Sequence, residues 1–235
     1  LSSMPVGDYD RRVVILSREL GKIAAFAKGA RRPNSHLIGV TRPFIFGTFE
    51  VYRGRDSYTI QKANVTNYFE ELVSDLDGVL YGYYFAELAE YYGRENLDAA
   101  DMINLLYVAF KALVNKSLPN ELVRYIYEIR LIAVNGECPD FFSCAGCGSE
   151  KELQLYSYKE NGMYCVECAA SSGDGIVLQS STLYTLQYII TAPLTKLFNF
   201  VVKADVLNEL KKVVNRIEFI TFDKHFKSKE MLDIG

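Results

Sequence analysis

The chain has 235 residues, of which 49% are hydrophobic, and its formal net charge is −3. This length allows two domains with sizeable cores, and the charge excludes a uniformly basic protein that binds polyanions over its whole surface. No apolar run reaches the length of a membrane span and no signal-peptide pattern opens the chain, so we expect a cytoplasmic protein without a membrane partner. Because the first residue is Leu1 rather than Met, we also expect further residues to precede it, including part of a first strand.

The first third of the chain is typical of β-structure. Alternating apolar residues between turn signals predict strands at 13–17, 21–28, 43–53 and 58–65. The segment 53–57 around Gly54 indicates a hairpin connection. Several short strands separated by turns favour a small barrel or sandwich.

From about residue 79 the pattern becomes helical, which predicts an α+β protein. Apolar residues recur at helical spacing from Leu80 to Leu88 and from Met102 to Val114, where Asp98 is expected as the N-cap. A helix after Pro119 is apolar on most sides and is therefore expected to be central, with its Glu128 and Arg130 reaching a rim or pairing with neighbours. Further helices are expected after Ser181, Pro193 and Asp205.

Four of the five cysteines form two CxxC pairs separated by seventeen residues, which is the spacing of a four-cysteine zinc site. The predicted ligands are Cys144, Cys147, Cys165 and Cys168. Four thiolates close the coordination sphere, so one Zn²⁺ would be structural rather than catalytic. Between the pairs we expect a strand at 153–158 and a hairpin turn at Asn161-Gly162, with the module ending near 171–175. Cys138 is interpreted as a small buried residue.

Positive charge is concentrated near the start of the chain. Residues 1–42 hold eight Lys or Arg against three acids, and no acid lies between Glu19 and Glu50. The strand at 21–28 runs into a loop that presents three cations together, as a phosphate-binding barrel surface would. We expect one groove lined by Arg18, Lys22, Lys28, Arg31, Arg32 and Arg42. Phe26 either stacks on a base there or fills the barrel.

Other functional motifs are few. The chain has neither a GxxxxGK[ST] loop nor a GxGxxG after a strand, and its two histidines give no credible catalytic triad, so we expect no enzyme activity. A looser set of lysines from Lys196 to Lys229 is expected mainly on the solvated faces of helices, with 224–229 as a possible extension of the binding path.

Several motifs, in their order along the chain, resemble the bacterial recombination mediator family RecO. They are the segments Leu-Gly-Lys-Ile at 20–23, Ala-Lys-Gly-Ala-Arg-Arg at 27–32, Tyr-Glu-Ile-Arg-Leu at 127–131 before the first CxxC pair, and Phe-Lys-Ser at 226–228. The resemblance implies an OB-fold barrel at 1–78, an α-helical domain at 79–235 and a zinc finger inserted at 138–172. It also implies that Lys28, Arg31 and Arg32 contact DNA and that the four paired cysteines bind zinc.

The same resemblance implies a recombination mediator. Such a protein binds single- and double-stranded DNA, anneals complementary strands and helps to load recombinase onto single-stranded DNA that is coated with single-stranded DNA-binding protein (SSB). The implied partners are RecR and the C-terminal tail of SSB, and the implied location is the cytoplasm near the nucleoid. Two alternatives stay open: a zinc-stabilised interaction scaffold without direct DNA contact, and a zinc-dependent hydrolase acting on nucleic acid.

Overall fold

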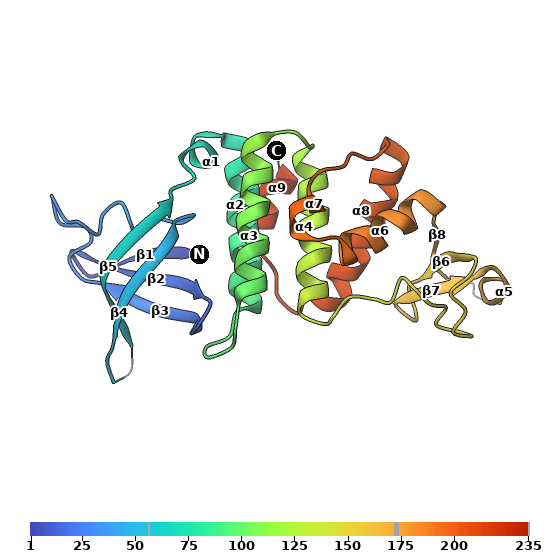
Figure 1. The fold of residues 1–235 in the computed structure, drawn as a ribbon, viewed down its shortest axis with the longest axis horizontal. Helices are drawn as coiled ribbons and strands as arrows, with labels where there is room; N and C mark the ends of the chain where they lie inside the picture. Colours follow the sequence, from blue (N-terminus) through green and yellow to red (C-terminus); the bar gives the residue numbers. More distant parts are fainter. Residues whose placement is uncertain (56, 172–173, 235) are drawn as a thin grey trace. The chain divides into compact units, whose positions relative to one another are not determined.

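The computed structural model of the chain describes residues 1–55, 57–171 and 174–234 (Figure 1). It divides into two compact units, Leu1–Val114 with Phe226–Gly235, and Asn115–His225. All five strands of the larger sheet belong to the first unit, and the second unit combines several helices with a smaller three-stranded sheet. The predicted α+β class is therefore confirmed. No described helix combines the length and apolarity that crossing a bilayer requires.

The first unit is built on a five-stranded sheet of order β1-β2-β3-β5-β4, in which only β3 and β5 run parallel. Alternate side chains of its central strands, such as Val13, Ile15, Ile23 and Ala25, point into one hydrophobic core. The strands are β1 (Ser2–Val6), β2 (Asp10–Ser17), β3 (Gly21–Ala27), β4 (Phe46–Arg53) and β5 (Tyr58–Asn67).

Four of these strands agree with the sequence-based prediction to within three residues at each end. The strand β1 was not predicted, because it contains Pro5 and its second half is exposed, so it lacks apolar alternation. The predicted connection at 53–57 includes Asp56, which lies outside the described residues.

The helices of the first unit are α1 (Glu70–Ser74), α2 (Leu76–Tyr92), α3 (Ala100–Asn115) and α9 (Lys227–Ile234). The Ala100 N–H donates to Asp98 Oδ1 at 2.7 Å, so the Asp98 side chain satisfies the first N–H of α3, although it lies one residue before the N-cap position at Ala99. The chain returns to α2 at its C-terminal end. The Phe226 ring packs 5.5 Å from that of Tyr91, and the Ser228 N–H donates to Glu87 at 3.1 Å.

The turn between β2 and β3 is fixed against the loop that follows α2. The Lys22 N–H donates to the Arg94 carbonyl oxygen at 3.0 Å, and the Asn96 N–H donates to that of Leu20 at 2.8 Å. Gly21 has a φ of +64°, and a Cβ there would lie 2.5 Å from the Leu97 carbonyl oxygen and still closer to that of Arg94. Only glycine meets both requirements at this position.

The second unit surrounds α4 (Asn120–Val134), in which ten residues are buried, as its apolar pattern predicted. The helices packed against α4 are α6 (Ser180–Thr191) and α8 (Ala204–Thr221), with the short α7 (Leu194–Leu197) between them in sequence. The unit also contains a small three-stranded sheet of order β7-β6-β8. Its strands are β6 (Leu153–Ser157), β7 (Gly162–Cys165) and β8 (Ile176–Val177), and the short helix α5 (Val166–Ala169) follows β7.

A buried charged cluster ties α4 to α8. Arg124 Nε donates to Glu128 Oε1 at 2.8 Å, and its Nη2 donates to Glu218 Oε1 at 3.4 Å. Glu128 is fully buried. Of the two outcomes predicted for Glu128, pairing with a neighbour is observed and reaching a rim is not. Burial, followed by the nearby Glu218 carboxylate, raises the pKa of Glu128 well above its usual value, with Arg124 opposing the shift.

We expect the Gly21→Ala variant to be destabilised by about 2–4 kcal/mol or to fail to fold, because the methyl group would displace backbone carbonyls that have no room to move. Urea unfolding measures the loss. Gly39→Ala is the matched control, since a Cβ at Gly39 meets nothing within 4 Å. Equal stability of the two variants would contradict the close packing of Gly21 against the carbonyl oxygens of Arg94 and Leu97.

We expect the contribution of Glu128 to the stability of the chain to be lost as the pH rises above the ordinary glutamate pKa and through the raised pKa of the folded state. The raised pKa means that the folded state holds a proton on Glu128 more tightly than the unfolded state does. Its stabilising contribution is therefore complete below the unfolded pKa and is lost as the pH rises through the folded pKa. Glu128→Gln keeps an uncharged group there and should flatten this dependence in urea unfolding. The exposed Glu160→Gln should not, and identical slopes in the two variants would contradict the assignment.

Candidate metal centre and nucleic-acid interface

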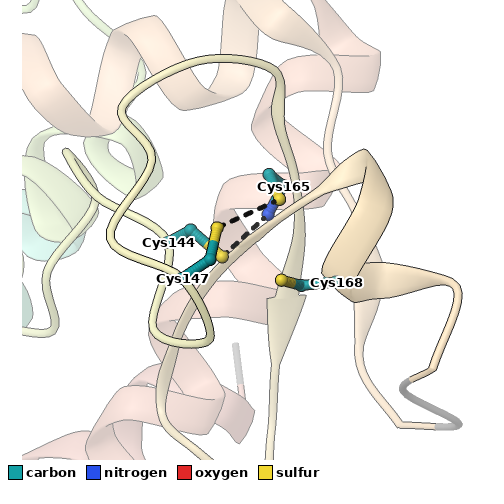
Figure 2. Close-up of side chains that lie close together, drawn as sticks. All are labelled: Cys144, Cys147, Cys165 and Cys168. Atoms are coloured by element: carbon teal, nitrogen blue, oxygen red, sulfur yellow. Dashed lines mark hydrogen bonds between the residues drawn. The ribbon is translucent and has the colours of Figure 1, made fainter.

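The four paired cysteines converge on one point (Figure 2). Cys144 and Cys147 lie in the loop before β6, Cys165 ends β7, and Cys168 lies in α5. Their sulfur atoms all lie within 4.8 Å of one another, and the Sγ atoms of Cys147 and Cys165 are 3.7 Å apart. The antiparallel pairing of β6 with β7 carries the second CxxC pair back to the first.

This geometry fits a tetrahedral metal ion. A Zn–S bond is about 2.3 Å long, so two ligands of a regular tetrahedral site lie about 3.8 Å apart. Four sulfur ligands leave no open position for water or substrate, so such an ion would hold the fold and perform no chemistry. Cys138 lies outside the cluster and is partly buried rather than buried as predicted.

Backbone hydrogen bonds shape the loop that carries the first pair. The Cys144 N–H donates to the Ser149 carbonyl oxygen and the Gly148 N–H donates to that of Cys144, each at 2.8 Å. Gly148 has a φ of +75°, which a glycine adopts without strain. The predicted strand at 153–158 and turn at Asn161-Gly162 are confirmed by the hairpin of β6 and β7. The predicted exit at 171–175 includes residues 172–173, which lie outside the described residues.

The thiols of the cluster differ in acidity. Burial opposes ionisation of Cys144, but the N–H groups of Cys165, Cys147 and Gly146 stabilise its thiolate and lower its pKa to about 6. Hydrogen bonds with the neighbouring Cys147, Cys144 and Cys165 raise the pKa of Cys168 to about 12. The Cys144 thiolate therefore forms readily, whereas the raised pKa of Cys168 keeps its thiol from ionising beside it. A divalent cation would stabilise both thiolates, which is why such clusters bind metal.

The basic loop, which we define as residues 28–34, is held by the turn between β1 and β2. The Gly29 N–H donates to Asp10 Oδ1 at 2.7 Å, and the Arg31 N–H donates to the Tyr9 carbonyl oxygen at 2.8 Å. The Arg32 guanidinium lies over the Tyr9 ring, 5.2 Å from its centroid. Within the described part of the chain, no carboxylate lies within ion-pair distance of Lys28, Arg31 or Arg32, and all three are exposed.

The other predicted cations lie elsewhere on the first unit. The Lys22 ammonium donates to the Glu90 carbonyl oxygen at 2.7 Å, so it is committed to α2. Arg18 donates to Asn104 Oδ1 of α3 at 3.1 Å. Arg18 and Arg42 line one cavity of about 900 Å³ beside α3. The structure therefore places Lys28, Arg31 and Arg32 in one loop, Arg18 and Arg42 at one cavity, and Lys22 against α2.

Phe26 lies on the face of β3 opposite to the hydrophobic core. Ile23, Ala25 and Ala27 alternate with it and are buried in that core, whereas Phe26 is half-buried outside it. The expectation that it might fill the barrel is therefore wrong. Sequence reasoning also missed Tyr9 and Asp10, which hold the basic loop. Gly7-Asp8 is a typical turn sequence next to these two residues, but it indicates a β-hairpin only if the strand β1 before it is known.

The chain matches two family models. The model described as Recombination protein O N terminal matches residues 1–69, and the one described as Recombination protein O C terminal matches residues 73–230. A protein named DNA repair protein RecO from Acetivibrio thermocellus is 30% identical, over 99% of this chain and 93% of its own length. The proteins of the same name from Alkaliphilus metalliredigens and Bacillus subtilis are each 27% identical, over 98% and 97% of this chain and 95% and 89% of their own lengths.

These matches run along nearly the whole chain, and their order agrees with the structure, from the N-terminal sheet to the helical part with its cysteine cluster. The five-stranded sheet is thereby identified with the OB-fold of the family's N-terminal domain. The chain belongs to the RecO family, and its role lies in DNA repair and recombination.

Proposed function

We propose that the chain is a DNA-binding recombination mediator that anneals complementary single strands and helps to load recombinase onto DNA coated with SSB. The observation that carries this proposal is the basic loop. Its three cations are exposed, have no carboxylate partner among the described residues and are held in place by the β1–β2 turn. Family membership supports the same assignment.

Binding by this loop would be electrostatic. Lys28, Arg31 and Arg32 would contact phosphates and release condensed counterions, which gives affinity without sequence preference. Arg18 and Arg42 would extend the contact beside their shared cavity, and Lys22 would contribute through its charge while it remains bonded to Glu90. Neutralised phosphates repel a second strand less, so complementary strands could pair on the same surface. This mechanism needs no covalent step.

The partners and the domain limits belong to the same proposal. We propose that the chain works in the cytoplasm near the nucleoid with RecR and with the C-terminal tail of SSB. The barrel at 1–78 would hold DNA, and the helical domain at 79–235, with its insertion at 138–172, would serve partner proteins. Support for this division is the family resemblance together with the position of the basic loop on the N-terminal sheet.

We propose that the metal of the cysteine cluster is one structural Zn²⁺ bound by Cys144, Cys147, Cys165 and Cys168. Support comes from the all-sulfur set and from sulfur spacings that suit a tetrahedral ion. The ion would clamp the loop of the first pair to the β6–β7 hairpin.

We expect Arg31→Ala combined with Arg32→Ala to weaken binding to every DNA sequence and to slow strand annealing. Removing two phosphate contacts should lower the slope of log affinity against log salt by about 1.4 for single strands. Fluorescence anisotropy at several salt concentrations measures both quantities. Lys151→Ala with Lys212→Ala is the matched control, since it removes two exposed charges from the second unit. An unchanged slope in the arginine variant would favour the scaffold without DNA contact.

We expect the purified protein to hold one zinc per chain and Cys165→Ser to lose it, because three thiolates bind less tightly than four. Elemental analysis measures the stoichiometry, and Co²⁺ substitution should give the absorption of a tetrahedral thiolate site. Cys138→Ser is the control and should retain the metal, since Cys138 lies outside the cluster. Full zinc occupancy in Cys165→Ser would contradict the ligand set.

A further inference from the structure

A group of three aromatic side chains lies on α6 and on the segment between α7 and α8, with Tyr184 exposed and Tyr188 and Phe200 half-buried. The rings of Tyr184 and Tyr188, one helical turn apart, are stacked with centroids 6.3 Å apart and an interplanar angle of 30°. The rings of Phe200 and Tyr188 meet edge to face at a centroid distance of 5.2 Å. Tyr184 ends this series and is 66% exposed. The second unit therefore presents a short aromatic stack whose outermost ring is open to solvent.

Two exposed lysines belong to the segments next to this aromatic stack. The Tyr188 hydroxyl donates to the Lys196 carbonyl oxygen at 3.3 Å, which holds the exposed Lys196 segment beside the ring. Lys203, also exposed, follows Phe200 by three residues. The sequence contains no Asp or Glu between Asp174 and Asp205. In space, the Glu209 carboxylate of α8 lies at the start of α6, where it accepts from the Gln179 N–H and from Gln179 Nε2, each at 3.0 Å.

We propose that Tyr184 and Tyr188 form a stacking platform for unpaired bases of single-stranded nucleic acid, with Lys196 and Lys203 beside the phosphates. The platform would be a second contact, separate from the basic loop, and the inference rests on the proposed function. A base placed on the open face of Tyr184 would extend the stack that the two rings already form.

The chemistry of the platform favours a single strand over the other candidate occupants. A duplex keeps its base faces stacked on each other and offers none to Tyr184. A protein segment would bury the neighbouring Val201, which is 72% exposed, and would gain from the two lysines only if it were itself acidic. Stacking is tolerant of sequence because every base has an aromatic face. The platform would thus distinguish single from double strands, whereas cations alone bind both.

The full-length chain can be tested with the Tyr184→Ala variant. Its affinity for a short single-stranded oligonucleotide should fall about five-fold or more, the size expected for one lost base stack. Its salt slope should match that of the unaltered chain, because no charge is removed, and its affinity for the corresponding duplex should be unchanged. Tyr184→Phe keeps the ring and should restore single-strand binding. Phe219→Ala is the matched control, since Phe219 is an aromatic residue of the same unit that is 77% exposed.

Three outcomes would overturn the platform: unchanged single-strand affinity in Tyr184→Ala, an equal loss of affinity for the duplex, or an equal loss in Phe219→Ala. The first would leave this surface to a protein partner. The arginine double variant separates this failure from that of the proposed function. If the arginine double variant has a lower slope of log affinity against log salt and Tyr184→Ala binds normally, the platform is wrong and the proposed function stands. If the arginine double variant binds DNA normally and Tyr184→Ala has a lower affinity for single strands, the basic loop is not a DNA contact and the platform stands.

Discussion

The hydrogen bonds from Gly29 and Arg31 to the β1–β2 turn are the constraint on which the position of the basic loop depends. They fix both ends of a tight turn, and the fully buried Ala27 and Ala30 anchor the same segment in the core. The loop is therefore ordered before any ligand arrives. A preordered cationic loop binds phosphate with a smaller loss of conformational entropy than a mobile one. In this arrangement the face of the Arg32 guanidinium lies over the Tyr9 ring, so the N–H groups at the guanidinium edge can still donate to a phosphate.

The two proposed contacts differ in what they recognise. The basic loop offers charge and so binds any polynucleotide backbone, whereas the platform at Tyr184 offers a ring face and so requires an unpaired base. A mediator of strand annealing needs both properties, because it must hold single strands and must release or tolerate the duplex that they form. The two contacts lie in different units, and each is formed by residues of its own unit.

The large cores of the two units and the small cysteine module are stabilised in different ways. The sheet and helices of the first unit and the helices around α4 bury many large apolar side chains, and the Arg124–Glu128–Glu218 cluster adds a directional contact within the second core. The cysteine module has much less apolar surface, with short strands and a helix of four residues. Small modules of this kind depend on a metal or on disulfides, because their cores are too small to offset the entropy of folding. A metal bound by the four cysteines would therefore stabilise the local fold of this module.

The sequence by itself determined the class of the fold, four of the five strands of the larger sheet, the central position of α4, the four clustered cysteines and the family, because each depends on periodicity or on fixed spacing along the chain. It did not determine what each cation contacts. Arg31 donates to the nearby Gly7 carbonyl oxygen, whereas Lys22 donates to that of Glu90 and Arg18 to the Asn104 side chain, both more than sixty residues away. The sequence also missed the buried state of Glu128 and the meeting of Tyr188 with Phe200. Periodicity shows which face of an element is buried, but only the tertiary structure decides which other element covers that face.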